Sequence, residues 1–296
     1  MPTHVTPTTA VFGSSGFIGR NILNGLRSSN QNALGVARVT CVGQLGFDLI
    51  NPDISHLALK ARGVTHAIIA AAVTGISACE KNPTETRKAN VEGTVELGRQ
   101  LGEDGIKIIA FSSDYVFDGI AGNYDEKSTV NPLNEYGRQK AEMEARLMQV
   151  CGDNVLILRL SKVYDLLNGS GTLLDEMVTK LMRNECLFAA GDQVFCPTCV
   201  NDVVSVVSRL LTMNASGLLH VAAPLKISRF ALAQLVVKEF GLNINLVNEI
   251  SLCDLQEGFA RPLNTSLVSK MLNQLFCHKF KTVQEGITKL KFNYGV

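Results

Sequence analysis

The chain has 296 residues, of which 46% are hydrophobic, and its formal net charge is +1. A chain of this length and composition can bury a sizeable core, and it is long for one compact domain. The balanced charge offers no electrostatic case for nucleic acid or an anionic membrane as a partner.

Three further properties of the sequence indicate a cytoplasmic protein. Met1 to Ala10 lacks the basic-then-apolar pattern of a secretory signal. The longest apolar stretch, around Ala67 to Val73, is far shorter than a segment that crosses a bilayer. The eight cysteines show no framework spacing, which suits a reducing compartment.

Strands and helices alternate through the first half of the chain. Expected strands lie at 8–12, 33–38, 65–73, 106–112 and 154–160, and expected helices lie at 21–27, 84–101 and 134–150. The run at 65–73 is almost wholly apolar, as a strand covered on both faces should be. Asn134 is a suitable N-cap for the last of these helices. The alternation predicts an α/β fold, a doubly wound parallel sheet with helices on both faces.

The pattern loosens after about Tyr164. There we expect helices at 172–182 and 201–211, a short extended piece at 193–198, and a strand at 218–222 that rejoins the main sheet. Short helices and loops are expected beyond Leu225. The interpretation is a main domain over 1–165, with returning segments near 190–222, and a smaller, interwoven lobe over 166–296.

Three glycines with G-x-x-G-x-x-G spacing lie between the first expected strand and the first expected helix. They are Gly13, Gly16 and Gly19, with Phe17 and Ile18 between the last two. Glycine permits a tight turn and a close approach of the backbone to a pyrophosphate, and the helix N-terminus offers N–H groups and a positive dipole end. The pattern predicts a dinucleotide-binding loop, and a merely glycine-rich turn is the alternative.

The end of the second expected strand bears on the choice of cofactor. An Asp or Glu there would accept hydrogen bonds from the adenosine ribose, but this chain has Arg38, and Arg20 follows the glycine loop. A guanidinium suits a 2′-phosphate better than a hydroxyl. We therefore predict NADPH, with NADH and an ordinary solvated charge at Arg38 as the alternatives.

Tyr136 and Lys140 are spaced i and i+4, so they share one face of the helix expected at 134–150. A nearby ammonium favours the phenolate, so Tyr136 can donate its proton to the alkoxide that forms when a carbonyl is reduced. Lys140 would also hold the nicotinamide ribose hydroxyls. Ser113, at the end of an expected parallel strand, would hydrogen-bond the substrate oxygen. We predict that these three residues are catalytic; a solvent-facing Tyr/Lys pair is the alternative.

These residues resemble the extended short-chain dehydrogenase/reductase superfamily, and within it the dTDP-4-dehydrorhamnose reductase family, over most of the chain. The matching segments are Gly13 to Gly19, Asp48-Leu49, Ala70-Ala71-Ala72, Asn90 to Thr94, Ser112 to Gly119, Tyr136 with Lys140, Asp192-Gln193 with Pro197-Thr198, and Arg261 to Thr265. The resemblance implies a Rossmann-type dinucleotide-binding domain, with Asp48 and Leu49 at the adenine. It implies that Ala70, Ala71 and Ala72 also contact the cofactor.

The same resemblance implies the reaction and the substrate site. Members of the family reduce the 4-keto group of a nucleotide-linked 4-keto-6-deoxy sugar, in the biosynthesis of rhamnose or a related deoxysugar. Ser113, Asp114 and Tyr115 would line the sugar site, and no metal is expected. The smaller lobe would hold the nucleotide diphosphate, with Lys162, Arg159 and Arg261 as candidate contacts or, equally, as surface charges or internal ion pairs.

Departures from the family pattern leave the nucleotide and the sugar open. Phe17-Ile18 replaces a Gln followed by an aliphatic residue, Ile69 replaces an asparagine, and Ser77 replaces an aspartate. Ser113 in place of threonine keeps the hydroxyl. The sequence does not decide whether the protein forms a homodimer.

Two other functions remain as alternatives. One is a bifunctional 3,5-epimerase/4-reductase, for which Cys79, Cys186 and His220 are candidate acids and bases, although none has a recognisable epimerase spacing. The other is a non-catalytic regulatory subunit like the β subunit of methionine adenosyltransferase, which resembles the same family. Cys196-Pro-Thr-Cys199 has the C-x-x-C form, but no second pair lies at zinc-finger spacing, and two cysteines beside a tight turn are the favoured interpretation.

Overall fold

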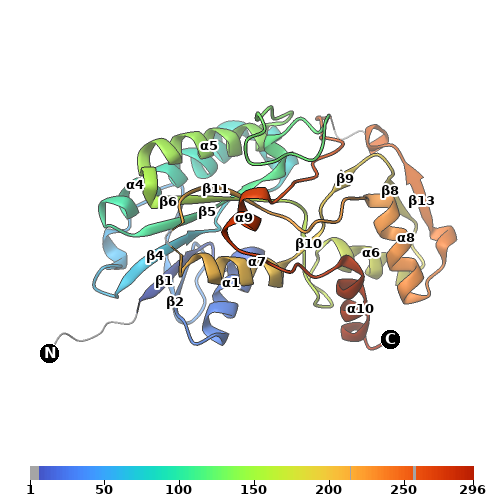
Figure 1. Cartoon of the computed structure of the whole chain (residues 1–296), viewed down its shortest axis with the longest axis horizontal. Coiled ribbons are helices and arrows are strands. Elements are labelled where there is room, and N and C mark those ends of the chain that lie inside the picture. The colour runs from blue at the N-terminus through green and yellow to red at the C-terminus, as the bar shows by residue number, and fades with distance from the viewer. Residues whose placement is uncertain (1–6, 214, 256–257) are drawn as a thin grey trace. The chain divides into compact units, whose positions relative to one another are not determined.

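The computed structural model describes residues 7–213, 215–255 and 258–296 (Figure 1). The chain divides into two compact units. The first contains Met1–Ser113, Asn134–Arg159 and Val204–Leu219, and the second contains Asp114–Leu133, Leu160–Val203 and His220–Val296. The chain therefore passes between the units five times, so each unit is assembled from segments that are distant in sequence.

A seven-stranded parallel sheet forms the centre of the first unit, in the order β11-β6-β5-β4-β1-β2-β3. The strands are β1 (Thr8–Phe12), β2 (Asn32–Ala37), β3 (Gln44–Gly46), β4 (Val64–Ile69), β5 (Lys107–Ser113), β6 (Val155–Leu160) and β11 (Gly217–Val221). The strand order reverses between β1 and β4, which is where ligands bind in open α/β sheets. The predicted α/β fold is confirmed, and so is the return of the strand expected at 218–222 to the main sheet.

Helices follow the strands of this sheet in alternation. They are α1 (Phe17–Ser28), α2 (Ile76–Lys81), α3 (Pro83–Arg87), the π-helical turn η2 (Lys88–Gly93), α4 (Thr94–Glu103), α5 (Glu135–Cys151) and α7 (Val200–Leu210), with 3₁₀ turns η1 (Ser55–Leu57), η3 (Asp114–Val116) and η4 (Gly152–Asn154). The single helix expected at 84–101 is thus three joined segments, interrupted by a π turn at Asn90. Asn134 caps α5 as predicted, because its Oδ1 accepts a hydrogen bond from the Gly137 N–H at 2.9 Å.

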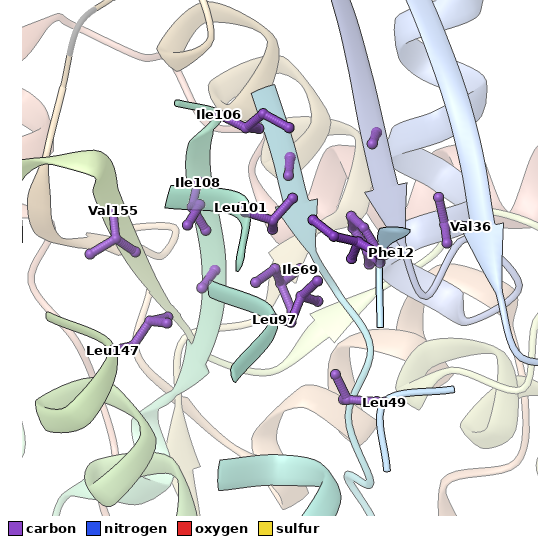
Figure 2. Close-up of a cluster of buried hydrophobic side chains, with 14 of the residues drawn as sticks. Phe12, Val36, Leu49, Ile69, Leu97, Leu101, Ile106, Ile108, Leu147 and Val155 are labelled. Atoms are coloured by element: carbon purple, nitrogen blue, oxygen red, sulfur yellow. The ribbon is translucent and has the colours of Figure 1, made fainter. Parts of the chain in front are cut away.

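The side chains drawn in Figure 2 form the core on one side of this sheet. Leu97 and Leu101 from α4 and Leu147 from α5 cluster with Phe12 and Ile108 from the strands, and all five are buried. Full burial of one such side chain stabilises the fold by roughly 1.5–3 kcal/mol. This packing fixes α4 and α5 against the sheet, and α5 carries the predicted tyrosine and lysine.

The second unit contains helices and three short two-stranded pairs. The helices are α6 (Leu173–Met182), α8 (Arg229–Phe240), α9 (Lys270–Leu275) and α10 (Val283–Tyr294), with 3₁₀ turns η5 (Ile244–Leu246) and η6 (Leu252–Leu255). The pairs are β7 (Val163–Tyr164) with β10 (Thr198–Cys199), β9 (Val194–Phe195) with β12 (Ile227–Ser228), and β8 (Leu187–Ala190) with β13 (Val247–Ile250). A separate buried cluster that includes Tyr164, Met177, Val236 and Ile287 holds them together. Every helix in the described part of the chain is too short or too polar to cross a membrane.

Candidate functional site

The glycine loop has the geometry of an anion-binding turn. Gly13 has φ +84°, a conformation that residues with a side chain rarely adopt. A Cβ there would also lie 2.5 Å from the backbone nitrogen of Ala71, so there is no room for a side chain. A Cβ on Gly19 would lie 2.2 Å from the carbonyl oxygen of Gly13. Helix α1 begins at Phe17 with Gly16 as its N-cap and with no side chain capping it. Its first N–H groups are therefore available to a phosphate.

A cavity of about 400 Å³ opens in the first unit at the carboxyl ends of β1, β2 and β4. Eight of the residues expected to bind the cofactor line it, namely Gly13, Gly16, Arg38, Asp48, Leu49, Ala70, Ala71 and Ala72. Phe17, Ile18 and Gly19 begin α1 and are not among the described residues that line this cavity. Their assignment as cofactor contacts stays a prediction.

Further lining residues were not expected from the sequence. They are Ser15, Val36, Ala37, Val39, Phe47, Ile50, Val73, Glu85, Thr86 and Ala89. Most are chain neighbours of residues that were expected, so the motifs located them indirectly. Glu85, Thr86 and Ala89 come from α3 and η2, and no sequence motif identified them as part of a binding site.

The cavity suits an adenine dinucleotide that carries an extra phosphate. Arg38 directly follows β2 in the wall of the cavity, and in the described part of the chain no carboxylate forms an ion pair with it. Its guanidinium can therefore bind a 2′-phosphate. Asp48 accepts a hydrogen bond from the Ile50 N–H at 3.0 Å, which shapes the turn that presents Leu49.

The three predicted catalytic residues all lie in the first unit and are almost fully buried. Ser113 and Tyr136 are each 9% exposed and Lys140 is 6% exposed. Ser113 ends β5, and Tyr136 and Lys140 lie one turn apart near the start of α5. Lys140 Nζ donates a hydrogen bond of 2.8 Å to the carbonyl oxygen of Phe111, which attaches this turn of α5 to β5.

Burial changes the acidity of Lys140. Removal from water lowers its pKa to about 8, against the opposing influence of Glu144 and Cys79. An ammonium has three donors, and apart from the bond to Phe111 they meet no hydrogen-bond acceptor among the described residues. Lys140 is therefore able to donate to the hydroxyls of a bound ribose.

In the second unit, Asp114 and Tyr115 follow Ser113 directly in the chain. The Asp114 carboxylate accepts hydrogen bonds from Ser161 Oγ at 3.1 Å and Thr265 Oγ1 at 2.7 Å, so one of its oxygens anchors the unit internally. Burial, with help from the Asp114 charge, raises the pKa of Tyr115 to about 12, and its hydroxyl interacts with Arg261. Tyr115 is therefore protonated at neutral pH and can hydrogen-bond a ligand as a neutral phenol. The substrate contacts assigned to this pair stay a prediction.

Basic side chains gather around Lys162 in the second unit. Partial removal from water and the positive charges of Arg229 and Arg261 lower the pKa of Lys162, while Asp114 and Glu176 oppose that effect. Lys162 and Arg261 were expected candidates for phosphate contacts. Arg229 was not, because it begins α8 and only the folded chain brings it near Lys162. A cluster of this kind attracts phosphate oxygens.

Arg159, the third candidate, has a structural role instead. Its guanidinium donates two hydrogen bonds to the Glu144 carboxylate, at 2.9 and 2.6 Å, and both residues are buried. Removing one partner of such a pair typically costs about 3–5 kcal/mol because the other charge stays buried. The pair links β6 to α5, and Arg159 is not available to a ligand.

The cysteines offer no evident second chemistry. Cys196 and Cys199 are both buried, and burial raises the pKa of each thiol to about 11, so neither is a reactive thiolate at neutral pH. Cys79 and His220, two of the candidate epimerase groups, are fully buried as well, whereas Cys186 is exposed. The described residues contain no group of three His, Cys, Asp or Glu side chains that could hold a metal ion.

A family model described as the RmlD substrate binding domain matches residues 8–294. The chain belongs to this family. The resemblance to dTDP-4-dehydrorhamnose reductases that the motifs indicated is confirmed. Among curated relatives, a probable low-salt glycan biosynthesis reductase of Haloferax volcanii is 29% identical over 75% of this chain and 75% of its own length. A dTDP-4-dehydrorhamnose reductase of Sinorhizobium fredii is 26% identical over 85% of this chain and 88% of its own.

Solved structures agree with the fold. The dTDP-4-dehydrorhamnose reductase of Bacillus anthracis, determined in complex with NADP, has a TM-score of 0.87 at 21% identity and covers 97% of this chain and 99% of its own. Other relatives have names that do not describe a reductase. The methionine adenosyltransferase 2 subunit beta of Bos taurus is 25% identical over 97% of this chain and 85% of its own.

Proposed function

We propose that this member of the RmlD substrate binding domain family is an NADPH-dependent reductase. It acts on the 4-keto group of a nucleotide-diphospho-4-keto-6-deoxy sugar. The observation that carries the proposal is the attachment of the Tyr136–Lys140 turn to β5 through the bond from Lys140 to Phe111. This bond attaches the Tyr136–Lys140 turn to β5 two residues before Ser113, which ends that strand. The dinucleotide cavity opens at the same edge of the sheet.

Each catalytic side chain has one task in the reduction. NADPH, when bound, supplies the hydride that reduces the carbonyl carbon. Ser113 Oγ donates a hydrogen bond to the carbonyl oxygen and fixes its direction. Tyr136 transfers its phenolic proton to that oxygen as negative charge develops there. The Lys140 ammonium stabilises the phenolate left on Tyr136 and donates hydrogen bonds to the ribose.

The nucleotide part of the substrate fits the basic cluster of the second unit. Lys162, Arg229 and Arg261 together offer several donors and positive charge to a diphosphate. Tyr115, which interacts with Arg261, offers a neutral hydroxyl to the sugar. A cytoplasmic location and a homodimer stay predictions.

The decisive test is NADPH oxidation by the purified protein. The substrates are freshly generated dTDP- and UDP-4-keto-6-deoxyglucose, each with and without a separate 3,5-epimerase. Oxidation that requires the epimerase identifies a dedicated reductase. Oxidation without it leaves an epimerase/reductase or reduction of the unepimerised sugar, and the stereochemistry of the product separates the two. Tight NADPH binding with no oxidation of any sugar would overturn the proposal and favour a regulatory role, like that of the methionine adenosyltransferase relatives.

The role of Tyr136 is tested separately with Tyr136→Phe. Loss of the phenolic proton is expected to lower kcat by about 100-fold or more, the usual contribution of a general acid. The Kd for NADPH, measured by fluorescence titration, should stay within about twofold, since the ring and Lys140 remain. Near-normal turnover by this variant would refute the assignment.

A further inference from the structure

Gln139 is a buried amide that the proposed chemistry does not use. It lies on α5 directly before Lys140 and is 1% exposed. Its Oε1 accepts a hydrogen bond from Asn90 Nδ2 at 2.9 Å, and its Nε2 donates to Thr86 Oγ1 at 2.9 Å. The carboxylate of Glu135, at 3.1 Å, and the carbonyl oxygen of Pro83, at 3.2 Å, are further acceptors for the same Nε2.

The partners of Gln139 belong to the wall of the dinucleotide cavity. Thr86 lines the cavity itself. Asn90, in the π turn η2, holds the backbone of Val73 with two hydrogen bonds, one from Val73 N at 2.7 Å and one to Val73 O at 2.9 Å. Val73 also lines the cavity. One side chain on α5 is thus connected to two segments of the cavity wall.

We propose that Gln139 is a positioning residue that couples the wall of the dinucleotide cavity to the orientation of Tyr136 and Lys140. The inference rests on the proposed reductase function. Helix α5 is attached to β5 through Lys140 and to α3 and η2 through Gln139, and both attachments lie within four residues of Tyr136. They therefore help to fix the turn that carries the phenol. A small misplacement of a reacting group is enough to lower a rate by about 100-fold. Losing the Gln139 attachment therefore affects turnover more than it affects cofactor affinity.

Two substitutions at this position separate hydrogen bonding from packing. Gln139→Met keeps the length of the side chain and removes both the donor and the acceptor. Gln139→Glu keeps the acceptor for Asn90 but places a carboxylate against Glu135, with Glu80, Cys79 and Lys140 as the other titratable groups nearby. Its protonated form can donate again, so its kcat relative to wild type should rise as the pH falls, whereas that of Gln139→Met should not. Gln149→Met, the same substitution at an exposed position of the same helix, is the matched control.

The expected result for Gln139→Met is a fall in kcat of at least about tenfold, with the Kd for NADPH changed by less than about threefold. A double-mutant cycle with Thr86→Val tests the network. If both residues act through one connection, the double variant is no slower than the slower single variant, whereas Gln149→Met combines multiplicatively with Thr86→Val. Unchanged kcat with a lowered Tm would show that Gln139 only stabilises the fold. Multiplicative effects of Gln139→Met and Thr86→Val would also overturn the proposal.

Hydrogen exchange gives a readout that does not depend on turnover. In the wild-type protein, NADPH should slow amide exchange in residues 72–90, five of which line the cavity, and also in residues 134–145, through Gln139 and through the ribose contact of Lys140. In Gln139→Met, the response of residues 134–145 should be weaker than in the wild-type protein, because only the direct contact remains, while the response of residues 72–90 should be unchanged. Should the wild-type protein bind NADPH but reduce no sugar, the proposed function fails while this comparison still decides the coupling. A response of residues 134–145 in the variant as large as in the wild-type protein would refute the coupling.

Discussion

Lys140 shows how burial alone changes the chemistry available to one residue. A solvated lysine is an inert cation at any physiological pH, with a pKa near 10.4. Here burial brings the pKa down to about 8, so the ammonium is still the major form at pH 7 but is lost in mildly alkaline solution. In the proposed reduction, the ammonium also stabilises the Tyr136 phenolate after proton transfer. Its loss therefore removes charge where the reaction needs it.

The pH profile of the reduction should report this ionisation. We expect kcat to be steady below about pH 8 and to fall above it, as Lys140 loses its proton. In Lys140→Arg the falling limb should disappear from this range, because a guanidinium does not deprotonate there, even though turnover is lower. Steady-state kinetics from pH 6 to pH 10 would check this. A limb near pH 8 that persists in the arginine variant would assign the ionisation to another group.

Arg38 should set the preference for the phosphorylated cofactor. Arg38→Ala removes one charge-assisted contact to a 2′-phosphate, and such contacts contribute about 1.5–3 kcal/mol. KM for NADPH should therefore rise by at least about tenfold while KM for NADH stays nearly constant. Arg20→Ala changes the other arginine near the glycine loop; it is exposed and is not among the described residues that line the cavity, so both KM values should stay nearly constant. Equal loss of both cofactors in Arg38→Ala would point to a damaged cavity and not to a lost phosphate contact.

At the scale of elements, the contact between α4 and α5 supports the catalytic helix. Gly98 allows the two helices to approach closely, because a Cβ there would lie 2.3 Å from Leu147 Cδ1 and 3.1 Å from Cys151 Sγ. Gly102, one turn later on α4, has no atom within 4 Å of its virtual Cβ. The two glycines lie on the same helix, but only a Cβ at Gly98 would meet neighbouring side chains, so Gly102 is a matched control for Gly98.

Alanine at these two positions should have opposite effects on stability. Gly98→Ala forces Leu147 and Cys151 to move, and overpacking of this kind costs about 1–3 kcal/mol, less the roughly 1 kcal/mol that alanine gains in a helix. Gly102→Ala should gain the same roughly 1 kcal/mol of helix stability without any cost from overpacking. Urea denaturation should therefore show a lower unfolding free energy for the first variant and an equal or higher one for the second. A neutral Gly98→Ala would mean that α4 and α5 separate at little cost.

The sequence predicted the regular elements of the sheet better than the irregular ones, for physical reasons. Strands at 8–12 and 154–160 were expected close to their observed bounds, because buried parallel strands are short, continuous apolar runs. The π turn η2 was missed, since one extra residue hardly disturbs the periodicity of a long amphipathic helix. The two-residue strands of the second unit were mostly missed, because a strand of two residues is too short to show a recognisable sequence pattern.

The same contrast holds for the candidate site. Gly13, Tyr136 and Lys140 belong to local motifs whose spacing already implies their chemistry. Arg229 and Gln139 do not, since their partners are distant in sequence and only the folded chain reveals them. For Arg159 the sequence left a ligand contact and an internal ion pair open, and only the folded chain shows that Glu144 pairs with it.

At the scale of the whole molecule, the chain passes between the two units five times, and this limits which fragments can fold alone. Residues 204–219 complete the first unit from beyond position 165. They bring in β11, which extends the sheet next to β6, and most of α7. Val204 of α7 lies so close to α1 that a Cβ on Gly25 would be 2.3 Å from its Cγ1. A fragment that ends at 165 lacks both elements and leaves the edge of β6 and one side of α1 exposed.

We therefore expect a fragment of residues 1–165 to aggregate or to lack stable tertiary structure, because an exposed sheet edge and an uncovered apolar helix face both promote association. A fragment of residues 1–222 contains every segment of the first unit, although it lacks much of the second, and should bind NADPH more tightly than 1–165 does. Circular dichroism and NADPH titration of the two fragments beside the full chain test this directly. If 1–165 bound NADPH as tightly as the full chain, α7 and β11 would be dispensable, and a domain boundary at 165 would describe the molecule better than the two interwoven units do.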